Sequence, residues 1–520
     1  MIIEKEIELT VGVQALEYVN TNGFDSCSIE FRMLKGSTFN GGVISVRKTN
    51  AISGVPVDFT PTKAVSAVGF VELTASDWQK ASYLVLQCTT SGGSAERVQA
   101  IIELKKNDHT SLIDPVDAVT TINNDHLDAF SRLRVSNPVS LFASQCQYDA
   151  EPLLWETGAT GTGIAGSHSA NTRMVALSAT AGTGTSFIQS YEYVPYQPGK
   201  SQLAFCTGLL GAAVADAIVD VGIFDADNGV FYRQDGTDGL AIVLRSSTSG
   251  SAVNNSIPQT NWNRDRLDGT GASGKTLDVT KVFILVIDAQ FLAMGRVRVG
   301  FDIDGVICWA HEFLNANVLA VPYMQTLSLP VQMLLTTTSA SSKTAYFKCA
   351  SVSSEGGLED DLAYQFSTPE QTVTAADGTR THILSLRPLT SFNSITNRMK
   401  LNLLSMDIAV TGSSPIRWEL AIGSAYSAGP TFSSVDATYS AMQYSSAVGT
   451  VSSVGIVIAS GYVAASNQSK GDVSAKINER YPITLDRSGA VRANGTLSLF
   501  VTGIGGASAS RASMTFSEIR

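Results

Sequence analysis

Two runs of alternating residues flank one Asp-Gly pair in the stretch Gly295-Arg-Val-Arg-Val-Gly-Phe-Asp-Ile-Asp-Gly-Val-Ile-Cys-Trp-Ala-His-Glu-Phe313. Their β-branched and aromatic residues predict strands over 295–303 and 306–313. Asp-Gly between such runs is typical of a type I′ turn, which needs positive φ at both central positions. The stretch therefore predicts an antiparallel hairpin. Similar short strands separated by tight turns are expected in the sequence on both sides of it.

Short β-strand patterns separated by turn residues continue over residues 141–357. Further strands are expected at 186–194, 202–209, 217–224, 229–233, 240–245, 282–287, 331–336 and 345–351, with Asp-Gly and Asn-Gly turns between several of them. About ten strands without a long helical pattern predict a double-sheet jelly roll.

The flanking sequence divides into three further segments. Residues 1–106 read as six or more short strands, which predicts an N-terminal β-sandwich. Residues 107–140 hold few β signals and several turn formers, which predicts a connector. Residues 358–520 again read as strands, with a Ser/Ala/Tyr/Gly-rich part at 425–453 that we expect to form surface loops. The predicted fold class is all-β: a multi-domain β-sandwich and jelly-roll protein with little helix.

The composition restricts the functions that the chain can have. Charged residues make up 16% of the chain, against about 25% in ordinary soluble domains. A weakly charged surface is typical of subunit contact, although Ser/Thr-rich β proteins show the same deficit. The net charge of −10 argues against a nucleic-acid groove. No run approaches the ~20 apolar residues of a membrane helix, so no membrane insertion is expected.

The N-terminus and the cysteines both bear on the compartment. The first residues, Met1-Ile-Ile-Glu-Lys-Glu-Ile-Glu-Leu9, alternate as a strand does, which predicts no signal peptide. The chain holds six cysteines and no Cys-x-x-Cys pair. We expect them to be free thiols, most of them buried, in a protein made in a reducing cytoplasm.

One stretch imitates a nucleotide site. Gly269-Thr-Gly-Ala-Ser-Gly-Lys-Thr276 fits the phosphate-loop pattern in full. That loop works only between a buried strand and a helix whose N-terminus faces the phosphates. Here polar residues precede it, and a strand at 282–287 follows too soon to leave room for a helix. We interpret the stretch as a Gly-rich surface loop, so no cofactor is predicted.

Clustered oxygens suggest a metal site in two turns. Asp225 and Asp227 are calcium candidates, as are Asp302 and Asp304. The alternative is that these residues form tight Asx turns, because Asp and Asn side chains hydrogen-bond their own backbone. The histidines show no ligand spacing and no Gly-x-Ser-x-Gly elbow is present, so no catalytic residue is predicted and the chain is not expected to be an enzyme.

Aromatic side chains provide the remaining surface candidates. Tyr191 and Tyr193 share one strand face by alternation, and with Trp262 they could stack on sugar rings or on a partner chain. Packing in the core or at an interface is the alternative for all three.

Two ordered sets of residues carry a resemblance. The first is Asp128-Ala-Phe-Ser-Arg-Leu-Arg-Val-Ser136 followed by Leu141-Phe142. The second comprises Gly222-Ile-Phe-Asp, Gly229-Val-Phe, Gln234-Asp-Gly236, Gln259, Trp262-Asn, Asp265, Leu267-Asp-Gly-Thr-Gly271, Gly295 to Gly305, His311-Glu-Phe313, Asn315-Ala-Asn317, Tyr323-Met324, Leu329-Pro330 and Ser354-Glu-Gly-Gly357. Together they resemble a family of virion structural proteins found in tailed-phage and large-virus genomes.

The resemblance implies a particle component: a tail fibre, a head decoration or a tail-associated subunit built on a lectin-like jelly roll. Expected partners are other virion proteins, further copies of the chain in a homo-oligomer, and a host surface glycan. The family implies no catalytic residues. A chain in this role would be made in the host cytoplasm and found in the virion.

Three functions follow as hypotheses. The first is a structural virion subunit, with Phe130, Arg132 and Arg134 of the connector contacting another chain; packing against the chain's own domains is the alternative for these residues. The second is a carbohydrate-binding module for receptor recognition. The third is a glycan-degrading tailspike, for which a repetitive β-helix pattern would be expected, and none is visible.

Overall fold

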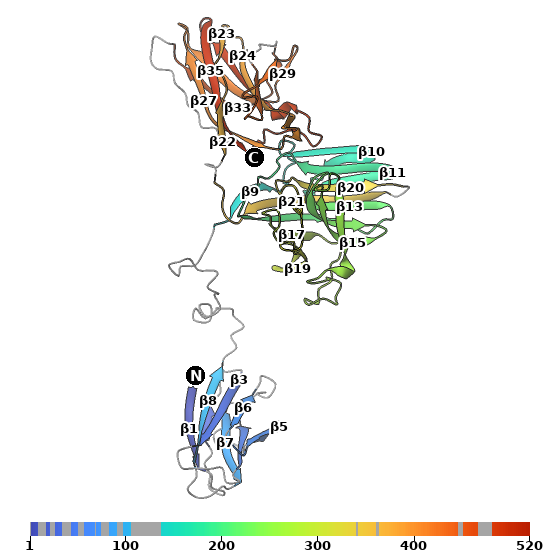
Figure 1. Ribbon diagram of the computed structural model, residues 1–520, viewed down its shortest axis with the longest axis vertical. Helices are drawn as coiled ribbons and strands as arrows, with labels where there is room; N and C mark the ends of the chain where they lie inside the picture. Colours follow the sequence, from blue (N-terminus) through green and yellow to red (C-terminus); the bar gives the residue numbers. More distant parts are fainter. Residues whose placement is uncertain are drawn as a thin grey trace. The chain divides into compact units, whose positions relative to one another are not determined.

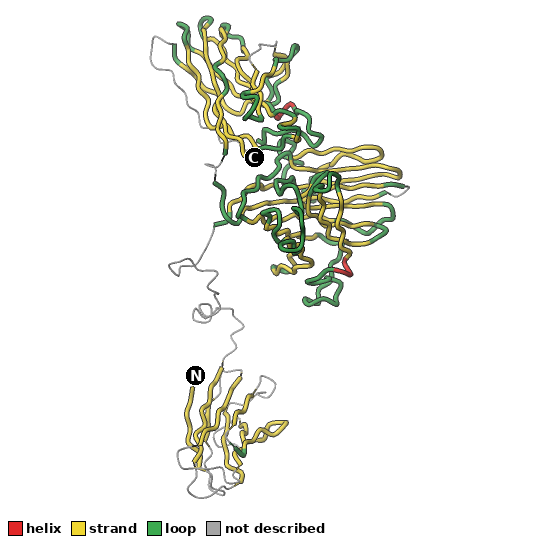
Figure 2. Tube along the Cα trace, viewed as in Figure 1, coloured by secondary structure: helices red, strands yellow, loops and turns green. Residues whose placement is uncertain are grey.

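The computed structural model describes residues 2–8, 17–20, 26–33, 43–49, 57–67, 69–73, 83–90, 97–105, 137–339, 342–359, 363–445, 451–465 and 481–520. Over these ranges the chain is built from strands, and its only helices are single 3₁₀ turns at Gln259–Asn261 and Ala493–Gly495 (Figure 2). The predicted all-β class is confirmed. No helix in the described part has the length and apolar character needed to cross a bilayer. The chain forms two compact units, Met1–Arg134 and Val135–Arg520.

The first unit is a sandwich of two four-stranded sheets, in the orders β1-β8-β3-β6 and β2-β7-β4-β5 (Figure 1). Alternate residues of β3 and β8 pack against those of β4 and β7 in one core that includes Phe31, Val46 and Leu86. The strands are β1 Ile2–Glu8, β2 Glu17–Asn20, β3 Ser26–Met33, β4 Val43–Thr49, β5 Val57–Val65, β6 Gly69–Leu73, β7 Tyr83–Thr90 and β8 Arg97–Lys105.

Most of the predicted connector, including Phe130, Arg132 and Arg134, lies outside the described residues. At its end the structure differs from the prediction, because Val139 and Ser140 already belong to strand β9 and pair with Ser354 and Ser353.

The second unit contains two hydrophobic cores, and we call the parts around them the roll lobe (β9 to β21) and the C-terminal lobe (β22 to β35). The strands of the roll lobe are β9 Val139–Ser144, β10 Trp155–His168, β11 Val175–Ser190, β12 Ser201–Leu209, β13 Ala217–Phe224, β14 Gly229–Asp235, β15 Gly239–Ser246, β16 Val253–Pro258, β17 Phe283–Gln290, β18 Val297–Ile303, β19 Val306–Phe313, β20 Val331–Thr337 and β21 Lys343–Ser354.

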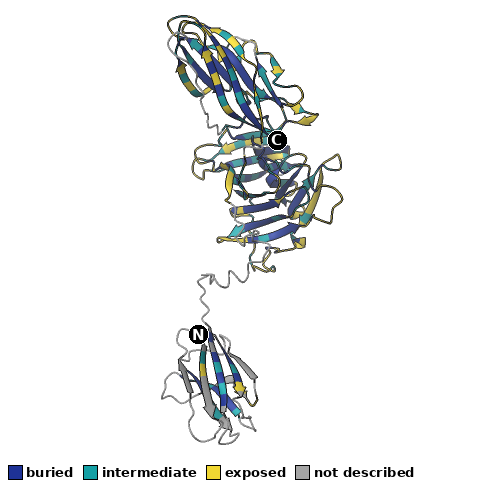
Figure 3. Ribbon diagram, turned by 60° about the vertical axis from the view of Figure 1, so that its left-hand side comes forward, coloured by how far each residue is buried: buried dark blue, intermediate teal, exposed yellow. Residues whose placement is uncertain are grey.

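The roll lobe has two layers that share one core. The β13 layer runs β16-β15-β14-β13-β20, and the β12 layer runs β21-β12-β17-β18-β19 with β9 beside β21. Rings from both layers meet inside, as where Tyr232 of β14 lies edge-on to Phe301 of β18 at 5.0 Å. The strands alternate between buried and more exposed residues (Figure 3), as expected when one face of each layer covers a core.

A single long hairpin joins the two layers. Residues 184–189 of β11 pair with β20 in the β13 layer, whereas residues 175–179 pair with β21 in the β12 layer. Its partner β10 pairs with it from Trp155 to His168, with register shifts between Gly161 and Gly163 and between Ile164 and Ser167. The predicted double-sheet roll is therefore present, but its layers form one continuous, curled sheet.

The Asp-Gly hairpin has the geometry that its sequence predicts. Strands β18 and β19 pair from Val297↔Phe313 to Ile303↔Val306. Between them Asp304 and Gly305 have φ of 60° and 80°, as a type I′ turn requires. The two turn residues thus specified the turn and the register next to it, whereas the ladder shifts register farther along, between Val299 and Gly300.

The C-terminal lobe is a second sandwich. A six-stranded sheet in the order β30-β31-β24-β34-β28-β33 packs on a smaller one in which β35 pairs with β22, β23 and β27. The strands are β22 Tyr364–Ser367, β23 Gln371–Ala375, β24 Thr381–Pro388, β25 Ser391–Phe392, β26 Ile395–Thr396, β27 Lys400–Val410, β28 Ile416–Ile422, β29 Ala425–Tyr426, β30 Phe432–Ser434, β31 Met442–Ser445, β32 Val451–Ser453, β33 Ile456–Val463, β34 Leu497–Gly503 and β35 Ser508–Ile519. The expected surface loops at 425–453 thus contain four short strands.

Candidate functional site

The two tyrosines predicted to face a ligand lie where the roll lobe meets the C-terminal lobe. The guanidinium of Arg492 stacks 3.7 Å from the ring centre of Tyr191, and that of Arg398 lies 4.5 Å from the ring centre of Tyr193. Both arginines belong to the C-terminal lobe. The structure therefore uses these aromatic faces for contact within the chain, which was the alternative interpretation of their spacing.

Further contacts strengthen this junction. Arg487 stacks over Phe187 at 4.4 Å, and its backbone N–H donates to the Glu156 carboxylate at 2.7 Å. Burial raises the pKa of Glu156 above its ordinary value and lowers that of Arg492 to about 10. A cavity of about 460 Å³ opens beside them, with Asp225 and Asp227 in its wall.

The calcium candidates are occupied by turn hydrogen bonds. The Oδ1 atom of Asp225 accepts the backbone N–H groups of Asp227 and Asn228 at 2.9 and 2.8 Å. Asp302 accepts the N–H of Gly305 in the same way. In the described part of the chain, no three His, Cys, Asp or Glu residues converge as metal ligands. The Asx-turn interpretation accounts for the geometry of both turns.

Trp262 is a core residue and not a surface one. Only 4% of it is exposed, and its ring stacks on Phe301 while its indole N–H donates to the Ile257 carbonyl. The ring is thus unavailable to a ligand on the surface, which corrects its placement among the surface candidates.

The phosphate-loop lookalike closes on itself as a surface loop. The N–H of Gly269 donates to the Lys275 carbonyl at 3.0 Å, and the Lys275 ammonium lies 2.6 Å from Asp304 in the neighbouring turn. Residues 269–282, all described, contain no helix before β17 begins at Phe283. No helix N-terminus therefore faces the loop, and the geometry that cradles phosphates is not formed.

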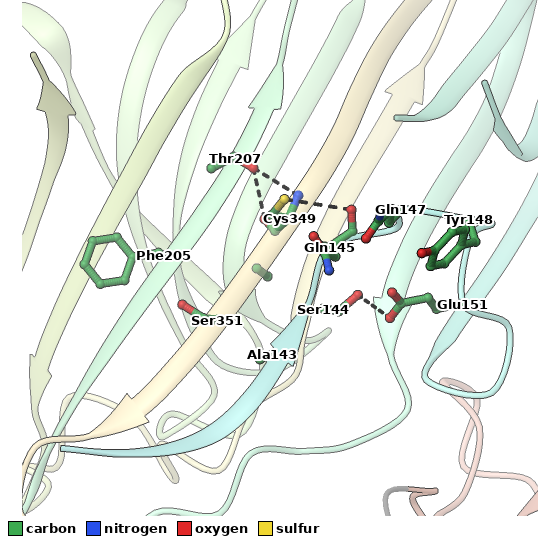
Figure 4. A pocket seen from close by; sticks show the side chains of 11 residues that line it. Ala143, Ser144, Gln145, Gln147, Tyr148, Glu151, Phe205, Thr207, Cys349 and Ser351 are labelled. Carbon is green, nitrogen blue, oxygen red and sulfur yellow. Dashed lines mark hydrogen bonds between the residues drawn. The ribbon is translucent and has the colours of Figure 1, made fainter. Parts of the chain in front are cut away.

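A better candidate lies on the outward face of the β12 layer. A groove of about 580 Å³ runs between β9, the segment 145–151, β12 and β21 (Figure 4). Phe205 and Thr207 of β12 line it, while Ala204 and Cys206, which alternate with them along the strand, point into the core. The alternation of the strand thus delivers one aromatic ring and one hydroxyl to the groove floor.

The segment beside the groove is held through three successive carbonyl groups. The carbonyl of Gln145 accepts the ammonium of Lys348 at 3.0 Å, and that of Gln147 accepts the guanidinium of Arg173 at 3.1 Å. Between them, a ring nitrogen of His168 lies 2.9 Å from the Cys146 carbonyl. These three contacts fix the backbone on both sides of Cys146, whose side chain is buried while those of Gln145 and Gln147 are exposed.

Backbone strain marks both ends of this segment. Cys146 and Glu151 each have a φ of 47°, a left-handed conformation that is costly for residues other than glycine. Such strain persists only where surrounding contacts enforce it, and it gathers at functional sites. Here the Glu151 carboxylate is fixed by Ser144, which donates to it at 2.7 Å and itself accepts the Trp155 indole N–H.

The side chains that this segment presents are available for binding. Tyr148 is 81% exposed, and Gln145 and Gln147 are exposed as well. The groove therefore combines a free aromatic ring, two amides that both donate and accept, and a fixed carboxylate at Glu151. Sequence reasoning missed it because no motif marks it; the one signal was polar-apolar alternation continuing from β9 through Cys146.

Comparison with known proteins gives distant likenesses only. No family model matches the sequence, and no curated protein matches it. Among solved structures, a carbohydrate esterase from the Shiga toxin-encoding bacteriophage phi24B is 11% identical, with 42% of this chain and 100% of that chain covered and a TM-score of 0.25. A legume lectin-like domain from Entamoeba histolytica is 9% identical, with 41% and 97% covered and a TM-score of 0.24. The lectin UEA-II, complexed with galactose, is 11% identical, with 42% and 100% covered and a TM-score of 0.25.

Proposed function

We propose that this chain is a structural subunit of a phage-like virus particle whose roll lobe binds carbohydrate at the groove beside β9. The observation that carries the proposal is the segment 145–148: Lys348, His168 and Arg173 hold the carbonyls of its first three residues, while the side chains of Gln145, Gln147 and Tyr148 are exposed. A site whose backbone is held before the ligand arrives loses little entropy on binding.

The chemistry of the groove fits a sugar. One face of a pyranose ring is apolar and can lie on the ring of Tyr148 or Phe205, whereas its hydroxyls both donate and accept hydrogen bonds. The amides of Gln145 and Gln147 and the hydroxyl of Ser351 offer both functions, whereas the Thr207 hydroxyl is already bonded to the Cys349 backbone. The open groove suits part of a longer glycan on a surface.

We further propose that the groove binds its ligand without cleaving it. Glycoside hydrolysis uses a pair of carboxylates about 5–10 Å apart. Among the residues that line the groove, all of them described, Glu151 supplies one carboxylate and the other ten supply none. Release of reducing ends from a bound glycan on incubation with the purified chain would refute this part of the proposal.

A glycan array probed with the full-length chain tests the binding proposal, followed by titration of the best ligand. Tyr148→Ala should weaken binding about two- to tenfold, because a stacked aromatic contributes roughly 0.5–1.5 kcal/mol and 1.4 kcal/mol corresponds to a factor of ten. Tyr439→Ala removes a ring that is 66% exposed on the C-terminal lobe and should leave the affinity unchanged. Equal affinities of both variants and the wild type would place the ligand elsewhere.

The particle role rests on the resemblance of residues 127–142 and 220–357 to virion structural proteins. In that setting the glycan would be one on the host surface, and the first unit or the connector would attach the chain to other virion proteins. Mass spectrometry and electron microscopy of purified particles test this directly. Absence of the chain from intact particles would refute the particle role and leave the groove proposal standing.

A further inference from the structure

The C-terminal lobe exposes a strand at the edge of its larger sheet. Strand β33 pairs with β28 along one side, and within the described residues no strand pairs with its other side. Such an edge offers a row of backbone N–H and C=O groups to any further strand. Natural proteins usually block these edges with charged residues, especially lysine, or with proline.

This edge has neither form of protection. From residue 420 to 469 the sequence contains one charged residue, Asp436, although 16% of the chain is charged. The part that includes the edge reads Val451-Ser-Ser-Val-Gly-Ile-Val-Ile-Ala-Ser-Gly-Tyr-Val463, without a charge or a proline. Ile456 and Val457 are exposed, and Tyr462 is 69% exposed.

Packing inside the lobe explains only part of this composition. Tyr426 lies across the outer face of the sheet, where its hydroxyl meets those of Ser385 and Ser498 at 3.3 and 3.0 Å. Low charge is expected for residues that cover a buried face. Burial does not explain the lack of charge at residues 452–457, five of which are exposed to solvent, or at the exposed Tyr462.

We propose that β33 is the contact through which a second copy of this chain binds, by antiparallel pairing of the two β33 edges about a two-fold axis. A strand edge is completed by another strand, and two identical edges complete each other in an isologous contact. Because β33 has no charged residue, pairing with itself places no like charges opposite one another. The strand also offers no charged side chain with which a partner of opposite charge could form an ion pair.

The geometry of β33 restricts where the pairing occurs. The ladder to β28 shifts register between Leu420 and Ala421, opposite Ile458, and such a bulge twists an edge locally. The regular run is therefore Ala459–Val463, with Tyr462 on its outward face. Gly461 points inward, because a Cβ there would lie 2.8 Å from the Trp418 indole. The short ladder needs the apolar side chains of Val457 and Tyr462 to complete the contact.

Sedimentation velocity and native mass spectrometry of the full-length chain across a concentration series test this proposal. The wild type should form a dimer, and Val457→Lys/Tyr462→Lys should weaken it at least tenfold, because the contact would gather four added ammonium groups, two from each copy, along one short ladder. Val318→Lys, at a position 70% exposed on the roll lobe, is the matched control and should dimerise as the wild type does. A monomeric wild type, or an assembly that the double variant leaves intact, would overturn the proposal.

Hydrogen exchange adds a readout that does not depend on mass. The amides of residues 459–463 should exchange more slowly as the wild-type concentration rises, and this effect should be lost in the double variant. Circular dichroism separates a lost contact from a lost fold. The proposal does not depend on the glycan groove, so sugar binding by isolated monomers should be unaffected by these substitutions.

Discussion

Lys343 places an ammonium group inside the roll lobe without a carboxylate beside it. It is buried, and within the described residues it donates to the Ala212 carbonyl and to Oε1 of Gln234. Burial lowers the pKa of Lys343 from 10.5 to about 8. Since both hydrogen-bond partners are neutral, the charge is solvated by dipoles alone, and the neutral amine is favoured more than in water.

This shift predicts how stability depends on pH. Between about pH 8 and pH 10.5 the unfolded chain keeps the Lys343 proton and the folded chain has lost it, so stability rises with pH in this window. The free energy of unfolding of the wild type relative to Lys343→Met should increase by about 1–3 kcal/mol across it. Urea titrations at several pH values measure this difference. The wild type relative to Lys281→Met, a substitution at an exposed position, should show no such increase. If the free energy of unfolding changed with pH in the same way in both variants, the lowered pKa of Lys343 would be contradicted.

Cys349 gives a direct reading of groove occupancy. Its thiol is half-buried and free, and it lines the groove. We expect a bound glycan to slow alkylation of Cys349 severalfold, as followed by peptide mass spectrometry. Cys88 of the first unit is the internal control and should react at an unchanged rate. Cys206 should stay unmodified, because burial raises its pKa to about 12 and little thiolate forms. Equal protection of Cys88 would indicate a nonspecific effect.

At the scale of elements, the crossing of the β10–β11 hairpin between the two layers depends on glycines. The sequence places Thr160-Gly-Thr-Gly163 opposite Gly182-Thr-Gly184. A Cβ on Gly163 would lie 1.6 Å from the Thr185 carbonyl oxygen, and one on Gly184 would lie 2.4 Å from the Gly163 nitrogen. The two backbones thus approach more closely than any side chain permits.

Gly163→Ala should therefore destabilise the roll lobe by more than about 3 kcal/mol, since a backbone contact cannot move aside as a side chain would. Gly429→Ala is the matched control, because a Cβ there meets nothing within 4 Å and should change stability by less than about 1 kcal/mol. Thermal denaturation of both variants measures the difference. A melting temperature for Gly163→Ala equal to that of Gly429→Ala would show that the corner can relax.

Elements with local signals were predictable from the sequence, and the way they join was not. Asp304-Gly305 specified the β18–β19 hairpin because a type I′ turn depends on two residues alone. The passage of β11 from one layer to the other depends on Gly163 and Gly184 meeting across a ladder, which alternation along one strand cannot reveal. The groove was missed for the same reason: Gln145, Phe205 and Cys349 come together only when β9, β12 and β21 are aligned.

At the scale of the second unit, three arginines of the C-terminal lobe each cover an aromatic ring of the roll lobe. Arg398, Arg487 and Arg492 lie over Tyr193, Phe187 and Tyr191 respectively. Lys400 adds an ion pair with the buried Glu192. Each such stack contributes about 0.5–2 kcal/mol. Tyr191 and Tyr193 were predicted as partner-facing aromatics, and the partner that the structure supplies is the other lobe of the same chain.

Tyr191→Ala/Tyr193→Ala should therefore uncouple the two lobes and leave the groove intact. In calorimetry we expect the lower-melting transition of the second unit to move down by about 2–16 °C, the shift that two lost stacks imply at this domain size. Tyr439→Ala, which removes an exposed ring over which none of these arginines stacks, should not move it. The double variant should bind glycan with wild-type affinity, because the ring of Tyr148 and the carbonyl contacts that fix its segment remain. If it instead lost sugar binding while its lobes still unfolded as in the wild type, the junction and not the groove would be the recognition site.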